Sequence, residues 1–196
     1  MEKRNETGIK TANRKLIVFN MLSLDGLFSG TNGELDWHHV DEEFNEFAVA
    51  QLHSIDILLF GRKTYQLMAN YWPTTGAVTD DPIVAGLMNG LPKIIFSKTL
   101  NNAEWNNTKL VKDNIEEEIH KLKAQTGKDM IILGSGSIVS ALAKTDLIDE
   151  YRIIVNPVVL GEGIPLFNQT GRLKLELINT KVFKSGNILL YYKPIK

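Results

Sequence analysis

The sequence contains no cysteine. This absence excludes disulfide bonds, a thiolate nucleophile and metal sites built on cysteine ligands. It is compatible with a reducing compartment, and we expect a cytoplasmic protein. Histidines do not take the place of the missing thiolates, because His38 and His39 are adjacent while His53 and His120 are isolated. We therefore expect no metal site.

An excess of one charge sign is also lacking. The chain has 22 Lys and Arg residues against 23 Asp and Glu residues, which gives a formal net charge of -1. Binding to a phosphate backbone needs clustered Lys and Arg side chains, and the sequence has no such cluster. We expect no nucleic-acid partner.

Long apolar runs are absent as well. The most apolar stretches, residues 16–24 and 153–160, are interrupted by Asn20 and by Asn156-Pro157, and both are far shorter than the roughly 20 residues that span a bilayer. The first 14 residues are polar and do not resemble a signal peptide. We expect no membrane segment, a flexible tail over residues 1–14 and a single domain over residues 15–196.

What the sequence does contain is an alternation of apolar strands and amphipathic helices. Strands are predicted at residues 15–22, 55–60, 93–97 and 130–133, with a short one at Leu110 and Val111. Helices are predicted after Asp41, over residues 62–70, after Asp81-Pro82, after Asp113 or Asn114, and after the glycine turn at residues 134–136. The alternation indicates a mainly parallel sheet.

The C-terminal quarter has a different pattern. Strands are predicted at residues 150–155, 173–183 and 188–193 without helices between them, and Ser185-Gly186 supplies a turn. The predicted fold class is therefore α/β, with a mixed, mainly parallel sheet that ends in an antiparallel C-terminal hairpin.

Three junctions between a strand and a helix carry residues that suit an anion. They are Gly61-Arg62 with Thr64, Ser97-Lys98-Thr99, and Gly134-Ser135-Gly136-Ser137. Backbone N–H groups and the helix dipole attract phosphates at such junctions, and the carboxyl ends of parallel strands share one sheet edge. Each motif alone is also compatible with a simple tight turn. Together they predict a dinucleotide site, and the two cationic side chains suggest a 2'-phosphate.

Acidic residues offer weaker candidates for catalysis. Asp25 in the sequence SLDG contacts a substrate or forms an Asx turn before Gly26. The acidic residues near Trp37, among them Glu42, cap a helix or protonate a substrate. No serine lies in a nucleophile elbow, so hydrolase chemistry is disfavoured.

Five motifs, taken in order, resemble the dihydrofolate reductase superfamily. They are SLDG at residues 23–26, GRKTY at 61–65, FSKT at 96–99, IILGSGS at 131–137 and DEYRIIVNPVVLGEGIPLF at 149–167. The sequence is more closely similar to the reductase domain of the bifunctional riboflavin-biosynthesis deaminase/reductase, in its stand-alone form. The resemblance covers about residues 15–193.

This resemblance implies a sheet of eight strands flanked by helices, with NADPH lying across it. By position, Arg62, Thr64, Ser97, Lys98 and Thr99 would hold the adenosine end and its 2'-phosphate. The turn from Gly134 through Ser135 and Gly136 to Ser137 would hold the pyrophosphate and back the nicotinamide, and Asp25 with Gly26 would belong to the loop over the nicotinamide. The hairpin and residues 157–167 would contribute to a homodimer.

The substrate is less well defined than the cofactor. The arginine and threonine that bind folate in dihydrofolate reductases are missing from residues 90–93 and 153–155. Leu133 replaces the acid that commonly precedes the glycine pair in riboflavin-pathway reductases. We predict an NADPH-dependent reductase of a small heterocyclic compound, with 5-amino-6-(5-phosphoribosylamino)uracil as one candidate substrate, and with Asp25 and Glu42 as catalytic candidates. Authentic dihydrofolate reductase and a catalytically silent NADPH-binding protein stay open as alternatives.

Overall fold

The computed structural model describes residues 14–195. Its elements, in chain order, are β1 (Leu16–Leu22), β2 (Leu27–Ser29), α1 (Glu42–His53), β3 (Ile55–Gly61), α2 (Arg62–Tyr71), α3 (Thr75–Asp80), α4 (Pro82–Gly90), β4 (Lys93–Phe96), β5 (Thr108–Val111), α5 (Ile115–Lys123), β6 (Asp129–Leu133), α6 (Gly136–Leu142), β7 (Glu150–Val155), β8 (Ile164–Pro165), β9 (Leu175–Val182) and β10 (Ile188–Pro194).

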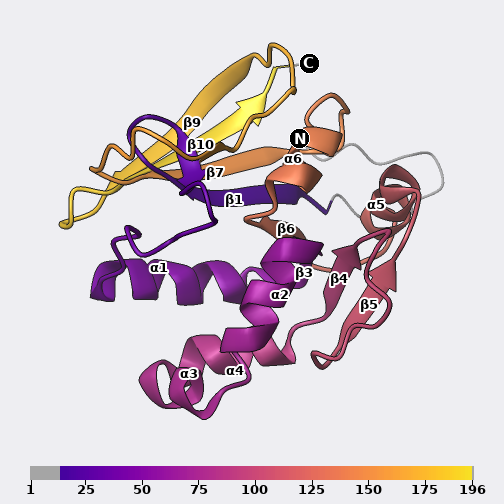
Figure 1. The fold of residues 1–196 in the computed structure, drawn as a ribbon. Coiled ribbons are helices and arrows are strands. Elements are labelled where there is room, and N and C mark those ends of the chain that lie inside the picture. The colour runs from indigo at the N-terminus through magenta and orange to yellow at the C-terminus, as the bar shows by residue number, and fades with distance from the viewer. Residues whose placement is uncertain (1–13, 196) are drawn as a thin grey trace.

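Eight of these strands form one sheet in the order β5-β4-β3-β6-β1-β7-β10-β9 (Figure 1). The pairs from β5 to β7 are parallel, and β10 is antiparallel to both β7 and β9. This arrangement confirms the predicted α/β class and the antiparallel C-terminal hairpin. The short strands β2 and β8 pair with each other, and the sequence pattern did not predict them or α3.

Helices cover both faces of the sheet because its central strands alternate between two apolar cores. On one face, Leu16 and Met130 pack in the core that contains α5 and α6. On the other face, Ile17 and Ile131 pack in the core that contains α1, α2 and α4. Figure 1 shows helices α1 to α4 together on one side of the sheet. Successive residues of each central strand are therefore buried on opposite faces.

Side-chain caps begin two helices as the sequence indicated. Asp41 accepts a hydrogen bond from the N–H of Phe44 at 2.8 Å, and Asp81 accepts one from Val84 at 3.0 Å before Pro82 opens α4. Helix α5 begins after Asn114, one of the two predicted positions, but without such a side-chain cap. Asn114 takes the N-cap position in a left-handed conformation with φ 54°, and its side chain forms no capping hydrogen bond.

The predicted tail over residues 1–14 lies outside the described residues except for Arg14. The Arg14 side chain is only 3% exposed. It forms an ion pair with Asp56 and donates to the carbonyl of Lys128 at 2.6 Å. Arg14 therefore fastens the start of β1 to the neighbouring parts of the sheet.

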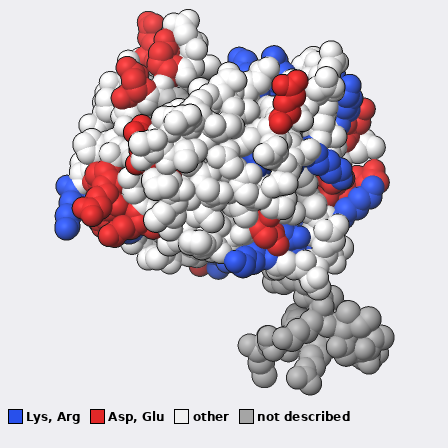
Figure 2. Space-filling model, turned by 90° about the horizontal axis from the view of Figure 1, so that it is seen from below, with Lys and Arg blue, Asp and Glu red and all other residues white. Residues whose placement is uncertain are grey.

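The outer surface of α2 to α4 carries little charge. Between Thr64 and Pro92 the only charged residues are Asp80 and Asp81. Seen from this side, the charged groups lie mainly around the rim of the face, and its centre is uncharged (Figure 2). Among residues 14–195, no helix has the length and apolar character needed to cross a membrane.

Candidate functional site

The three predicted anion-binding junctions lie side by side at one edge of the sheet. Gly61, at the end of β3, is in register with Phe96 at the end of β4. On the other side of β3, Leu59 is in register with Ile132 of β6. Because these strands are parallel, the turns that follow Gly61, Phe96 and Leu133 meet at their carboxyl ends. The structure thus brings together residues that are 74 positions apart in the chain.

Ser135 connects two of these junctions directly. Its Oγ accepts a hydrogen bond from the N–H of Gly61 at 2.8 Å, and its own N–H donates to Oγ1 of Thr64 at 3.1 Å. The hydroxyl also donates to the carbonyl of Leu133 at 3.2 Å. Ser135 is 4% exposed and has a left-handed backbone with φ 60°. Its side chain therefore joins β3 to β6 inside the protein.

Close approaches at the glycines shape this edge. A Cβ at Gly134 would lie 3.1 Å from Cγ2 of Thr64, and Gly134 also has φ +59°. A Cβ at Gly136 would lie 3.1 Å from the ring of Phe28 in β2. The N–H groups of Gly136 and Ser137 have no hydrogen-bond acceptor among residues 14–195. These two donors are available to an external anion at the start of α6.

Two cationic side chains at the edge are exposed to solvent. Arg62 follows Gly61 directly and forms no ion pair within the described part of the chain. Lys98 is 83% exposed, and its Nζ is 4.0 Å from a carboxylate oxygen of Asp113. Ser97 stabilises the turn below Lys98, because its Oγ accepts the N–H of Leu100 at 3.0 Å. Arg62 is thus unpaired within the described residues, whereas Lys98 has one weak, exposed ion pair with Asp113.

Asp25 lies near the same edge, in the loop after β1, but its carboxylate is occupied. Its oxygens accept the N–H groups of Leu160 at 3.2 Å and Gly161 at 2.8 Å. A hydrogen bond from the Ser23 side chain, followed by that from Gly161, lowers the pKa of Asp25 to about 2. Gly26 completes the turn with φ +83°. Asp25 is thus an ionised group that connects this loop to the segment after β7.

The sequence comparisons identify the family. Residues 14–191 match the family described as the RibD C-terminal domain. The chain belongs to the RibD C-terminal domain family. The uncharacterized protein YyaP of Bacillus subtilis (strain 168) is 36% identical over 182 residues, which cover 91% of this chain and 94% of that protein. A second uncharacterized protein of the same organism, YwjB, is 27% identical over 98% of its length.

Solved structures show the same fold for this RibD C-terminal domain protein. A putative riboflavin biosynthesis protein from Shewanella sp. PV-4 superposes with a TM-score of 0.72 at 26% identity, covering 93% of this chain and 99% of that one. Dihydrofolate reductase from Enterococcus faecalis, complexed with NADP(H), gives a TM-score of 0.64 at 15% identity, covering 93% and 97%. The fold is dihydrofolate reductase-like.

In this RibD C-terminal domain protein, the structure also reveals residues that the sequence did not single out. Asn156, buried after β7, accepts the N–H of His39 at 3.1 Å, and Asn187 donates to the carbonyl of His39 at 2.8 Å. The neighbouring His38 has a buried Nε2 without a hydrogen-bond partner, and burial lowers its pKa to about 4. These contacts hold the loop over residues 30–41 against the carboxyl end of β7 and the turn between β9 and β10. The sequence shows Asn156 before Pro157, but it does not show that Asn156 bonds to His39.

The second catalytic candidate, Glu42, is the exposed first residue of α1. It follows the loop that Asn156 and Asn187 fasten, so it lies toward the same sheet edge as Asp25. No contact of its carboxylate with another described residue fixes it. Among residues 14–195 there is no group of three or more His, Asp or Glu side chains arranged to hold a metal ion.

Replacing Ser135 tests whether its side chain stabilises the contact between β3 and the turn after β6. We expect Ser135→Ala to lower the free energy of unfolding by about 1–3 kcal/mol, because the buried N–H of Gly61 loses its acceptor. Ser135→Gly should lose less, since glycine adopts φ 60° without strain. Ser137→Ala, which removes an exposed hydroxyl, is the control. Urea unfolding measures all three, and an Ala variant as stable as the Ser137 control would contradict the proposed role.

Proposed function

We propose that this protein is an NADPH-dependent reductase that transfers hydride to a small heterocyclic substrate. The observation that carries the proposal is the convergence of Gly61-Arg62, Ser97-Lys98 and the turn at residues 134–137 at one edge of a dihydrofolate reductase-like sheet. Riboflavin-pathway compounds such as 5-amino-6-(5-phosphoribosylamino)uracil are the favoured substrate class, in view of the family.

The chain's residues fit a phosphorylated dinucleotide. The N–H groups of Gly136 and Ser137 would bind its pyrophosphate at the start of α6. Arg62 and Lys98, both exposed and following the neighbouring strands β3 and β4, would bind the 2'-phosphate. Ser135 would keep these groups in place, since it connects the N–H of Gly61 with Thr64. Bound NADPH would supply the hydride.

The two acidic candidates receive different roles. Asp25 keeps its negative charge at neutral pH and positions the loop after β1, so it is suited to orienting a substrate and poorly suited to donating a proton. Glu42 is exposed and without a fixed partner, and we propose Glu42 or a water molecule as the proton donor. Both assignments belong to the proposed reaction.

Cofactor titration tests the proposal. We expect NADPH to raise the melting temperature and to bind more tightly than NADH. Arg62→Ala and Lys98→Ala should each weaken NADPH binding by about 1–3 kcal/mol and leave NADH binding unchanged, because each removes a charge-assisted hydrogen bond to phosphate. Lys63→Ala, at the exposed position next to Arg62, is the control. Equal losses for both cofactors would contradict the 2'-phosphate assignment.

Substrate assays separate the alternatives. Oxidation of NADPH with dihydrofolate would identify a dihydrofolate reductase, and oxidation with pyrimidine or other heterocyclic compounds supports the proposal. The carboxylate of Asp25 already accepts two backbone hydrogen bonds within the protein. This favours one further candidate, a protein that binds NADPH without turnover. Tight cofactor binding with no oxidation across pyrimidine, pterin and carbonyl substrates would establish that candidate.

We also propose that the protein forms a homodimer. Strand β9 is an edge strand of the sheet, and its side chains Leu177, Ile178 and Val182 are exposed. An uncovered edge with apolar side chains is a common site of strand pairing between copies. A single species of 22.0 kDa in sedimentation would contradict the proposal.

A further inference from the structure

A cavity lies at the opposite end of the parallel strands from the three junctions that follow Gly61, Phe96 and Leu133. Its volume is about 480 Å³, and it is bounded by the turn after α6, the start of β7, the segment before β9 and the end of β10. Tyr151 is the second residue of β7, and Leu175 is the first of β9. The cavity therefore shares no residue with the proposed cofactor site.

The cavity combines an apolar wall with a cationic rim. Apolar side chains come from Ala143, Leu173, Leu175, Pro194 and Ile195. The rim carries three cations, Lys144, Arg172 and Lys174, against one acid, Asp146. None of these four forms an ion pair with another residue in the range 14–195. The charges at the rim therefore favour an anion and are not neutralised from within the protein.

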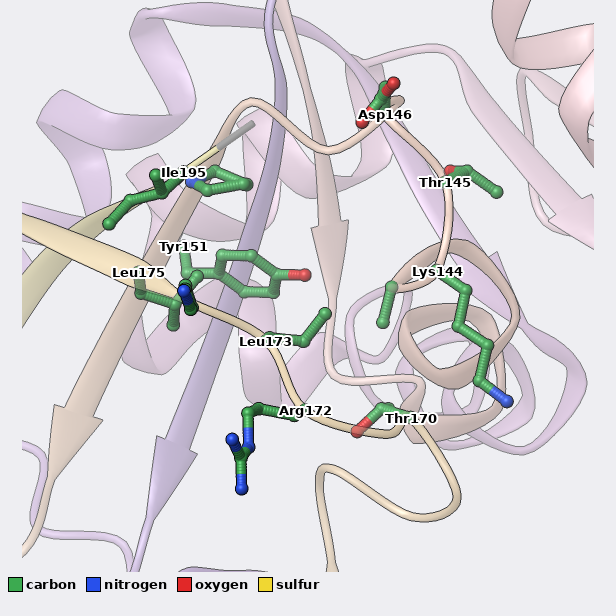
Figure 3. Close-up of a pocket in the computed structure, with 12 residues that line it drawn as sticks. Lys144, Thr145, Asp146, Tyr151, Thr170, Arg172, Leu173, Leu175 and Ile195 are labelled. Carbon is green, nitrogen blue, oxygen red and sulfur yellow. The ribbon is translucent and has the colours of Figure 1, made fainter.

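The hydroxyl of Tyr151 points into this cavity (Figure 3). The Tyr151 residue is 1% exposed, and its hydroxyl has no hydrogen-bond partner among residues 14–195. The hydroxyl lies at the cavity wall, so water or a ligand in the cavity can accept its hydrogen bond. Burial raises the pKa of Tyr151 to about 12, so the hydroxyl keeps its proton and acts as a donor. This donor is therefore available to a ligand that displaces water from the cavity.

We propose that this cavity binds a small organic anion. Its phosphate or carboxylate would face the rim formed by Lys144 and Arg172 and accept a hydrogen bond from Tyr151, and its apolar or aromatic part would contact Leu173 and Ile195. The site is independent of the reductase proposal, because it lies at the opposite end of the strands. Water can also accept the hydrogen bond of the Tyr151 hydroxyl, and in that case replacing Tyr151 does not change ligand affinity.

Two-dimensional NMR of the full chain locates binding directly. Phenyl phosphate and benzoate serve as probes with the two anionic groups, and phenol serves as the neutral probe. We expect both anions to shift the amide signals of Gly171, Arg172 and Ile195 more strongly than phenol does. The relative affinity of the two anions then shows whether phosphate or carboxylate is the preferred group. Shifts confined to Gly61 and Gly136, or no saturable shifts at about 10 mM probe, overturn the proposal.

Variants separate the cavity from the rest of the molecule. The double variant Lys144→Gln/Arg172→Gln should raise the Kd of the anionic probes about tenfold. Tyr151→Phe should raise it about fivefold without lowering the melting temperature, since no protein hydrogen bond is lost. Lys121→Gln and Tyr192→Phe, which lie outside the cavity lining, are the matched controls. Unchanged probe affinity in Tyr151→Phe shows that only water meets the hydroxyl and overturns the proposal.

NADPH titrations keep this proposal distinct from the reductase proposal. We expect NADPH to shift Gly61 and Gly136 and to leave the affinity of phenyl phosphate for the cavity unchanged. Loss of NADPH binding alone would refute the reductase proposal and leave the cavity in place. Displacement of the probe from Gly171 by NADPH would show that the two ligands share one site, and would overturn the inference of a separate one.

Discussion

Replacing Lys93 with alanine is expected to lower the free energy of unfolding by about 3–5 kcal/mol. Lys93 is 1% exposed, and its Nζ donates to the carbonyls of Asn89 at 3.0 Å and Leu91 at 2.7 Å. The same Nζ lies 4.4 Å from the ring centre of Trp105. Alanine would leave a cavity beside Trp105 and two carbonyls without their donor.

Urea unfolding followed by tryptophan fluorescence measures this loss. Lys109→Ala on the adjacent strand β5 is the control, because its ion pair with Glu118 lies at the surface and should contribute less than about 1 kcal/mol. Lys93→Met keeps most of the volume and removes the donors, so its loss should lie between the two. A loss below 1 kcal/mol for Lys93→Ala would show that the buried lysine is dispensable.

Lys93 also predicts a dependence on alkaline pH. Burial lowers the pKa of Lys93 from 10.5 to about 8. Between these values the unfolded chain holds the proton that the folded chain has released, so the free energy of unfolding should rise as pH increases from 8 to about 10. The neutral amine still has two N–H donors for its two carbonyls. Lys93→Met should remove this rise.

Acidification from pH 6.5 to 4.5 should destabilise the protein through His38. Burial lowers the pKa of His38 from 6.5 to about 4, so the unfolded chain takes up a proton in this interval and the folded chain does not. The free energy of unfolding should therefore fall as pH decreases, by up to about 3 kcal/mol at the lower end. The lowered pKa of Asp25 acts at more acidic pH and does not overlap with this interval.

His38→Phe separates this effect from other titrations. Phenylalanine keeps a ring against Trp37 and removes both the titration and the buried, unpartnered Nε2. We expect the variant to lose most of the decrease in stability between pH 6.5 and 4.5, while His53→Gln at the exposed end of α1 keeps it. Hydrogen exchange should show the loop over residues 30–41 opening first. An unchanged pH profile in His38→Phe would rule out His38 as the cause.

Much of the fold was predictable because it depends on local patterns. The strands that contain Ile17 and Ile131 are continuous apolar runs, as expected for strands that are buried on both faces of a sheet. Asp41 and Asp81 are of a residue type that commonly caps helices. Parallel strands place their carboxyl ends at one edge, so the presence of Gly61 and the turn at Gly134 at the same edge followed from the predicted parallel sheet, while the neighbouring positions of β3 and β6 did not. The elements that were missed are short: β2, β8 and α3 have between two and six residues.

Side-chain partners distant in sequence were not predictable. Nothing in the residues around Ser135 shows that its hydroxyl accepts the N–H of Gly61, since the two lie 74 positions apart. A lysine is expected at the surface, so the burial of Lys93 also needed the structure. The sequence likewise suggested Asp25 as a substrate contact, whereas the structure shows where its two oxygens are engaged. The substrate and cofactor assignments stay predictions.

The contacts of Arg14 with Asp56 and Lys128 determine how the protein can best be attached to a surface. Arg14 precedes β1 at its amino end, and Ile195 follows β10, which runs antiparallel to β7 and so ends at the same end of the sheet. A tether joined ahead of Arg14 would therefore hold the protein to a sensor surface with the proposed cofactor edge facing solution. A tether beyond Ile195 would lie beside the cavity that Tyr151 lines and would obstruct the binding of its probes.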